Sequence, residues 1–296
     1  MRNSILSFIV IILSSMLAHG ATFQTPMGDS EWAVDSSIFE CKMTHAIPYY
    51  GKGVFYKEAG EPSEFNLLPN SSRLKTGKAS LVSEAPIWKP AGRNINLGFV
   101  NVRQGENPIT LPSSKSERVL SELFAGQKVV FTRHPWYGAE RSARVVLSSV
   151  NFARAYKEYQ TCLTALLPVN FDQINRTAIY FPSGTENLRP SEVRKLENIA
   201  VYVKADPSVK SFYIDGHTDA VGGRGENLEL SKMRAEMIAS ILQDKGIPSE
   251  QISIRWHGER YPVVTNRTRV GRAQNRRVTI RLGRSDAPKL PELASN

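Results

Sequence analysis

The chain has 296 residues, of which 41% are hydrophobic and 22% charged, and its formal net charge is +10. The length exceeds one average domain, and the balance of apolar and charged residues is typical of a globular protein. This composition excludes a collagen-like chain, a protein with many membrane-spanning helices and a small disulfide-rich scaffold.

The first 20 residues have the pattern of a secretory signal peptide. A short basic start precedes an apolar run from Ile5 to Leu17, and Ala18 and Gly20 are small residues where a signal peptidase reads. The run is shorter than the roughly 20 residues that cross a bilayer, so a retained anchor is the weaker alternative. We therefore expect residues 1–20 to be removed, leaving a periplasmic chain without a transmembrane segment.

Two cysteines follow this segment. Cys41 lies in an alternating run over 38–43 that predicts a strand, and Cys162 lies on an apolar stripe with helical spacing. Because an exported chain enters an oxidising compartment, a disulfide between them is expected. The alternative is a pair of buried free thiols.

The pattern changes near Pro168. Before residue 149, short alternating runs are separated by Gly, Pro and Asn, which predicts a mainly antiparallel β domain closed by a helix over 151–167. The N-terminal domain is thus expected over 21–167.

After Pro168, strands alternate with helices in a β/α/β/α/β order, and one further strand follows. The strands are predicted at 178–181, 212–214, 252–254 and 278–280, and the helices from about 190 and over 226–245. Gly246 is expected to end the second helix. An α/β domain is therefore predicted over 168–284, with a flexible tail over 285–296.

The clearest candidate site lies in this second half. Asp219 follows a buried strand, at the carboxyl end where α/β units bind ligands, and Arg234 lies on the helix that comes next. A carboxylate and a guanidinium beside one groove suit a zwitterion, because the Asp accepts an ammonium and the Arg binds a carboxylate. The alternative is an internal salt bridge without a ligand.

Other chemistry is less well supported. Asp215, His217, Asp219 and His257 lack the spacing of a metal site, so structural roles are favoured for them. The glycines at 222–225 lack the Gly-Lys-Ser/Thr of a phosphate loop, and no nucleophile–base pair or paired carboxylates suggest a catalytic site. We therefore expect binding without catalysis and without a metal or cofactor.

Arginines are concentrated between 255 and 284, where Glu259 is the only acidic residue. No ladder of aromatic residues accompanies them, and the chain is predicted to leave the cytoplasm, so nucleic acid is not the expected partner. An acidic wall polymer or a partner protein is favoured, and some of these arginines are expected to pair within the chain.

Several linked motifs resemble the family of OmpA-like peptidoglycan-binding domains over about 171–282. They are Gly216-His217-Thr218-Asp219, Asn227, Leu230-Ser231, Arg234-Ala235, Gly258 and Gly271-Arg272-Ala273-Gln274-Asn275-Arg276-Arg277-Val278. The resemblance implies that Asp219 binds the amino group, and Arg234 a carboxylate, of diaminopimelate in the wall peptide. It also implies that a groove is lined by Thr218, Asn227, Leu230 and Phe181 and braced by Asn275 and Arg276.

The first half resembles the MotY family of sodium-driven flagellar motors. The matching segments are Phe39-Glu40-Cys41, His45-Ala46-Ile47-Pro48, Gly53-Val54-Phe55 and Leu147-Ser148-Ser149-Val150-Asn151-Phe152, with Tyr156 and Cys162. This resemblance implies a non-enzymatic adaptor that attaches to the flagellar basal body and, with MotX, recruits and anchors stator units.

Two alternatives to this adaptor stay open. One is an outer-membrane or periplasmic OmpA-like wall-anchoring protein with another partner, although the short, Pro-broken strands of the first half argue against an outer-membrane protein. The other is a wall-modifying enzyme, which would need a catalytic cluster in the first half. His45 and His134 are isolated there, so the enzyme is the weakest alternative.

Overall fold

The computed structural model describes residues 21–70, 76–86, 93–133 and 142–285. The expected signal peptide over 1–20 and nearly all of the expected tail lie outside these residues. The chain forms two compact units, and the second contains the chain from Cys162 onward together with Ser36–Cys41 and Lys57–Pro62. Among the described residues, no helix is both long enough and apolar enough to cross a membrane.

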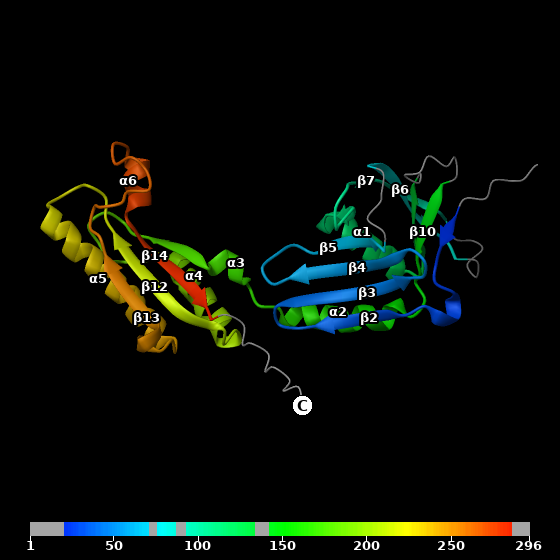
Figure 1. Ribbon diagram of the computed structural model, residues 1–296, viewed down its shortest axis with the longest axis horizontal. Coiled ribbons are helices and arrows are strands. Elements are labelled where there is room, and N and C mark those ends of the chain that lie inside the picture. Colours follow the sequence, from blue (N-terminus) through cyan, green and yellow to red (C-terminus); the bar gives the residue numbers. More distant parts are fainter. Residues whose placement is uncertain (1–20, 71–75, 87–92, 134–141, 286–296) are drawn as a thin grey trace, which may run out of the picture. The chain divides into compact units, whose positions relative to one another are not determined.

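The first unit is built largely from two five-stranded sheets, with the strand orders β1-β10-β9-β6-β7 and β2-β3-β4-β5-β8 (Figure 1). The strands of the first sheet are β1 (Thr22–Phe23), β10 (Ala143–Leu147), β9 (Lys128–Arg133), β6 (Gly77–Glu84) and β7 (Ile95–Val102). Those of the second are β2 (Trp32–Ser36), β3 (Glu40–Ile47), β4 (Gly51–Glu58), β5 (Glu64–Pro69) and β8 (Ile109–Leu111). The pairs β9–β10, β4–β5, β5–β8, β6–β7 and β6–β9 are antiparallel, as predicted, whereas β1 and β10 are parallel.

Three helical segments accompany these sheets: the short η1 (Met27–Asp29), α1 (Ser113–Phe124) and α2 (Phe152–Ala165). The sequence predicted α2 but not α1. The apolar residues of α1 are confined to its second half, where Val119, Leu120 and Leu123 are buried. Serines and charged residues fill its first half, so the apolar pattern covers too few residues to predict a helix.

The predicted disulfide between Cys41 on β3 and Cys162 on α2 is present, with the two Cα atoms 6.0 Å apart. The alternation expected around Cys41 is also confirmed, because Cys41, Met43, His45 and Ile47 of β3 are all buried. The bridge closes a segment of 121 residues. In the chain-entropy model such a loop contributes about 4–5 kcal/mol to the free energy of unfolding.

The second unit contains a four-stranded sheet with the order β11-β14-β12-β13. Its strands are β11 (Arg176–Tyr180), β12 (Val209–His217), β13 (Ile252–Trp256) and β14 (Arg277–Arg284). Its helical segments are α3 (Phe171–Ile174), α4 (Pro190–Ala205), α5 (Arg224–Asp244), η2 (Ser249–Gln251) and α6 (Arg269–Asn275). The predicted α/β domain is therefore confirmed, although α6 was not predicted, because its seven residues are too few to show a helical period.

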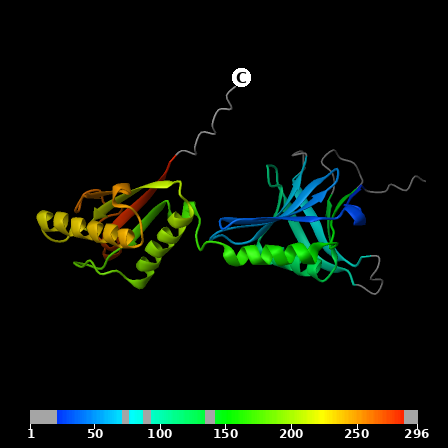
Figure 2. The same ribbon diagram turned by 90° about the horizontal axis from the view of Figure 1, so that it is seen from below.

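One face of this sheet forms the core of the second unit. Ile179, Ile214 and Ile280 point toward α4 and α5, which lie on the same side of the strands (Figure 2). Gly246 follows α5 with a φ of +95°, a left-handed conformation that glycine adopts without strain, and ends the helix as predicted. The opposite face of the sheet carries the alternate residues of each strand.

Candidate ligand-binding site

The candidate site is built where β12 ends and the chain turns toward α5. Gly216 is required at this point, because a Cβ there would collide with the carbonyl oxygen of Ser231 on α5. The buried Ser231 hydroxyl accepts a hydrogen bond from the Gly258 N–H at 3.0 Å, and Gly258 in turn accepts one from the Thr218 N–H at 2.9 Å. This close contact of strand, helix and loop holds Thr218 and Asp219 in place.

Asp219 is 4% exposed and forms an ion pair with Arg276. Its Oδ2 accepts a hydrogen bond from Arg276 Nη1 at 2.7 Å, and its Oδ1 accepts one from the Val221 N–H at 3.2 Å. Arg276 Nε also donates to the carbonyl of Phe181 at 3.1 Å. A carboxylate can accept about four hydrogen bonds, so Asp219 retains capacity for an ammonium group.

Arg234 points from α5 into a cradle of backbone carbonyls. Its Nε and Nη2 donate to the Thr185 carbonyl at 2.9 and 2.6 Å, and Nη2 also donates to the Pro182 carbonyl at 3.1 Å. The guanidinium carbon lies 4.8 Å from the centre of the Phe181 ring. These contacts fix the plane of the guanidinium group.

Nη1 of Arg234 is buried without a hydrogen-bond partner in the described structure, and so is the Oγ1 atom of Thr218. A buried polar atom without a partner costs about 1–3 kcal/mol, so native proteins rarely keep one unless a ligand or water completes it. A polar ligand or a water molecule would complete the hydrogen bonding of these two atoms.

The structure corrects one expectation about this pair. The sequence predicted that Asp219 and Arg234 lie at a groove rather than in the core, but the relative exposed surface of Arg234 is 0%. The reason is the cradle from the 182–185 segment, whose carbonyls cover the guanidinium. Nor do the two side chains form an ion pair with each other, since Asp219 pairs with Arg276.

Charges of both signs act on Arg234. Burial lowers the pKa of Arg234 to about 10, and the charge of Arg276 acts in the same direction. Asp219 and Glu186 oppose this shift. Because two guanidiniums and two carboxylates act here, the electrostatic surroundings suit a ligand that carries both charges rather than a bare anion.

The other residues expected at the groove lie in varied surroundings. Asn227 is buried on α5 and donates to the Glu259 carboxylate at 3.0 Å. Phe181 is buried beneath Arg234, and Leu230 is half-buried on α5.

Asn275 is fully buried and organises the loop before α6. Its Oδ1 accepts from the N–H groups of Val263 and Val264, and its Nδ2 donates to the Val264 carbonyl and to Asn266 Oδ1. All of its hydrogen-bonding capacity is thus used within the chain. Its contacts are those of a brace for the loop that also carries Gly258.

Asp215 lies on the opposite face of the sheet from α5 and is the centre of a second charged cluster. It accepts hydrogen bonds from Arg255 at 2.7 and 3.1 Å, from Arg281 at 3.2 Å and from His257 at 3.2 Å. Burial acts to raise the pKa of Asp215, but the bonds from Arg255 and His257 and the charges of Arg255 and Arg281 together lower it. The structural role favoured for Asp215 agrees with these contacts. In the described part of the chain, no group of three or more His, Cys, Asp or Glu residues could hold a metal ion.

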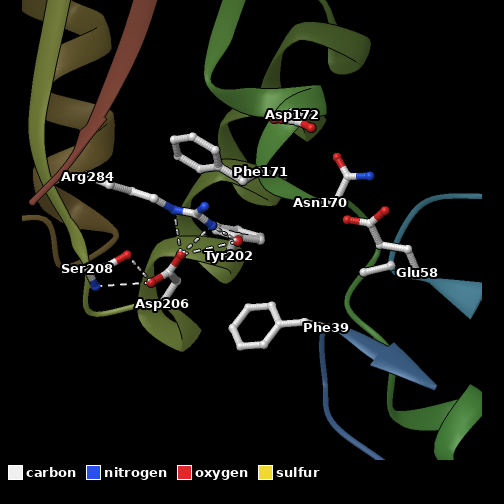
Figure 3. A pocket seen from close by; sticks show the side chains of 10 residues that line it. Phe39, Glu58, Asn170, Phe171, Asp172, Tyr202, Asp206, Ser208 and Arg284 are labelled. Carbon is white, nitrogen blue, oxygen red and sulfur yellow. Dashed lines mark hydrogen bonds and ion pairs between the residues drawn. The ribbon is translucent and has the colours of Figure 1, made fainter. Parts of the chain in front are cut away.

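Arg284 belongs to a separate pocket of about 370 Å³ in the second unit (Figure 3). It donates to Asp206 at 2.8 and 3.1 Å and to the Tyr202 hydroxyl at 2.6 Å, and it stacks at 3.7 Å on Phe171. Asp206 also accepts from the N–H and hydroxyl groups of Ser208 at 3.0 and 2.6 Å. Because these charged groups are paired with one another, the pocket shows less sign of a missing ligand.

Comparison with known proteins assigns both parts of the chain. The model of the MotY N-terminal domain matches residues 23–168, and that of the OmpA family matches residues 180–276. The chain joins a MotY N-terminal domain to an OmpA-family domain. The predicted resemblances are thus confirmed for both halves.

Individual relatives agree with this assignment. The sodium-type flagellar protein MotY of Vibrio parahaemolyticus is 29% identical over 278 residues, which cover 92% of this chain and 94% of that one. The outer-membrane lipoprotein YfiB of Pseudomonas aeruginosa is 36% identical over 102 residues, 34% of this chain and 60% of YfiB. Among solved structures, the C-terminal domain of Helicobacter pylori MotB is similar at 22% identity, with a TM-score of 0.35, and covers 37% of this chain and 86% of that one.

Sequence reasoning missed the carbonyls of Pro182 and Thr185 in the OmpA-family domain. The Pro-Ser-Gly run at 182–184 signals a turn, and Gly184 does have a φ of +66°. The direction of the carbonyl groups in such a turn is set by the backbone, so no side-chain pattern in the sequence could show it.

Proposed function

We propose that this protein is a non-enzymatic periplasmic adaptor of the flagellar basal body that binds peptidoglycan through its OmpA-family domain. Its N-terminal domain would attach to the basal body and, with MotX, help to recruit and anchor the sodium-driven stator. The combination of domains and the 94% coverage of the Vibrio MotY protein support this role.

The observation that carries the wall-binding part is the pair of buried, unpartnered polar atoms, Arg234 Nη1 and Thr218 Oγ1. A carboxylate of diaminopimelate would accept hydrogen bonds from both. The amino group on the same carbon would then face Asp219, whose carboxylate has acceptor capacity beyond its bonds to Arg276 and Val221. The carboxylate and the ammonium carried by one carbon of the ligand would thus meet Arg234 and Asp219.

Binding at this site requires a local opening, because Arg234 has no exposed surface. The segment that covers it is held to the guanidinium by the Pro182 and Thr185 carbonyls. Those same bonds orient Arg234 while the segment is closed, and they leave Nη1 as the atom that an entering carboxylate would meet. Charge-assisted hydrogen bonds of this kind contribute about 1.5–3 kcal/mol each.

We also propose a division of labour along the chain. Residues 1–20 would direct export, 21–167 would attach to the motor, 168–284 would bind the wall, and 285–296 would form a tail. A fragment over 21–167 should then localise to the flagellar base without sedimenting with purified wall sacculi. Sedimentation of that fragment equal to that of the full chain would contradict the division.

Sedimentation of the full chain with sacculi tests the proposed site. Asp219→Asn keeps the shape of the side chain but removes its charge, and it should weaken binding about tenfold. Asp244→Asn is the matched control, because Asp244 is exposed at the end of α5. Equal binding by a folded Asp219→Asn protein and its control would refute the role given to Asp219.

A further inference from the structure

The face of the four-stranded sheet opposite α4 and α5 carries an unusual set of side chains. Ile179, Ile214, Ile254 and Ile280 pack toward the helices, so their strand neighbours point to the other side. We call this the arginine face and define it by Arg176, Arg255, Arg281, Tyr180 and Tyr213. Arg176 and Tyr213 are exposed, and the side chains of Arg255 and Arg281 are 51% and 43% exposed.

Positive charge on this face is not balanced. Arg176 stands directly opposite Arg281 in the β11–β14 pair, an arrangement that destabilises a sheet. Arg277 lies on the same side of β14 and is buried, and Arg176 contributes to lowering the pKa of Arg277, after burial. Asp215 is the only acidic residue at the outward positions of the four described strands, and it is already shared by Arg255, Arg281 and His257.

The arginines are also held in position. Arg255 makes two hydrogen bonds to Asp215, and Arg281 makes one while its guanidinium lies 5.4 Å from the centre of the Tyr213 ring. A guanidinium has five N–H donors, so Arg281 keeps most of its donors for another partner. Fixed guanidiniums favour short, oriented contacts with carboxylates over a diffuse attraction to a charged surface.

The geometry points to a docking surface for an extended acidic segment of a partner protein. Side chains on neighbouring strands are about 5 Å apart, and alternate residues along a strand are about 7 Å apart. Arg176 and Arg281 are direct partners on β11 and β14, and Arg255 lies two strands from Arg281 and bonds the same Asp215. An extended peptide that crosses the strands can therefore bring carboxylates to Arg176, Arg281 and Arg255. Tyr213, which pairs with Arg281 across β12 and β14, would supply apolar contact between them. This inference is independent of the proposed wall-binding site, because it uses the opposite face of the sheet.

Binding of a short synthetic peptide of alternating Glu and Thr to the full-length protein tests the inference. The variant Arg176→Gln/Arg281→Gln should bind this peptide at least about tenfold more weakly than the wild type. The variant Arg194→Gln/Lys204→Gln removes the same charge from exposed positions of α4 and should bind like the wild type. A peptide of alternating Lys and Thr should not bind.

Two further measurements keep the test decisive. Thermal melting should show that both double variants fold. If Arg176→Gln/Arg281→Gln does not fold, Arg176→Gln alone replaces it, because this single change removes no hydrogen bond of the described structure. Vesicles of phosphatidylglycerol should not displace the peptide. Equal weakening by the two double variants would show general charge attraction, and preferential binding of the vesicles would assign the face to a lipid surface; either result overturns the inference.

Discussion

Two aspartate–arginine clusters lie on opposite faces of one sheet, and they differ in how completely their polar atoms are paired. Asp215 accepts hydrogen bonds from two arginines and a histidine. Asp219 is paired with Arg276, but the neighbouring Arg234 and Thr218 each keep a buried polar atom without a partner. A cluster whose carboxylate is fully bonded stabilises the fold, whereas unpaired buried atoms reserve binding capacity for a ligand.

The comparison also shows why composition alone could not separate the two. Both clusters arise from the segment 215–219 and from arginines in the last part of the chain. Asp215 lies within β12, whereas Asp219 lies beyond the strand end, past the point where Gly216 packs against α5. Substitutions at the two aspartates should therefore separate stability from binding.

The stability of the second unit should fall as the pH is lowered from about 6.5 to 4. Burial, with the nearby charge of Arg277, lowers the pKa of His217 to about 4, so the folded state resists a proton that the unfolded chain accepts. The free energy of unfolding should decrease by up to roughly 3 kcal/mol over this window. Below about pH 4 His217 should contribute no further decrease. Asp215, whose pKa is lowered below its ordinary value, should cause a further loss only at still lower pH.

Urea denaturation at a series of pH values measures this effect. His217→Gln cannot take up a proton and should flatten the curve between pH 6.5 and 4. An unchanged slope in that variant would show that another group is responsible.

Asp215→Ala should lower the free energy of unfolding by about 1.5–2 kcal/mol, because it removes the hydrogen bonds to Arg255 and Arg281, whose half-exposed guanidiniums water can partly solvate. Binding to sacculi should not change in the folded fraction, since the site lies on the other side of the sheet. Denaturation and sedimentation of the same sample measure both quantities. A loss of binding without a loss of stability would reverse the roles assigned to the two clusters.

Arg234→Lys should weaken binding to sacculi about tenfold, which corresponds to about 1.4 kcal/mol. Lysine keeps the positive charge but cannot bond the 182–185 carbonyls and a ligand carboxylate in one plane. Arg194→Lys on the exposed surface of α4 is the matched control. Binding of Arg234→Lys at the strength of the control would mean that charge alone is required.

Thr218→Val should leave stability unchanged within about 1 kcal/mol, because the Oγ1 atom that it removes has no partner in the described structure. It should nevertheless reduce binding several-fold, since a ligand carboxylate would lose one hydrogen bond. Thermal melting and sedimentation of this variant provide the two readings. A marked loss of stability would instead reveal a structural hydrogen bond of Thr218.

Much of the fold was predictable because burial in a strand or helix repeats at a fixed period. The alternation around Cys41 identified β3 and its buried face, and the alternation of strands and helices after Pro168 identified the OmpA-family domain. At the site, Asp219 and Arg234 were found from their positions after a strand and on a helix. Their pairing was not, because Arg276 comes from 57 residues beyond Asp219 and the carbonyls around Arg234 belong to a turn.

The most direct test compares how well two soluble wall peptides displace the protein from sacculi. One peptide contains diaminopimelate and the other contains lysine at the same position. Lysine lacks the second carboxylate that would accept hydrogen bonds from Arg234 and Thr218. The diaminopimelate peptide should therefore displace the full-length protein from sacculi at a concentration at least about tenfold lower than the lysine peptide. Equal displacement by the two peptides would contradict the assignment of the buried, unpartnered atoms to this ligand.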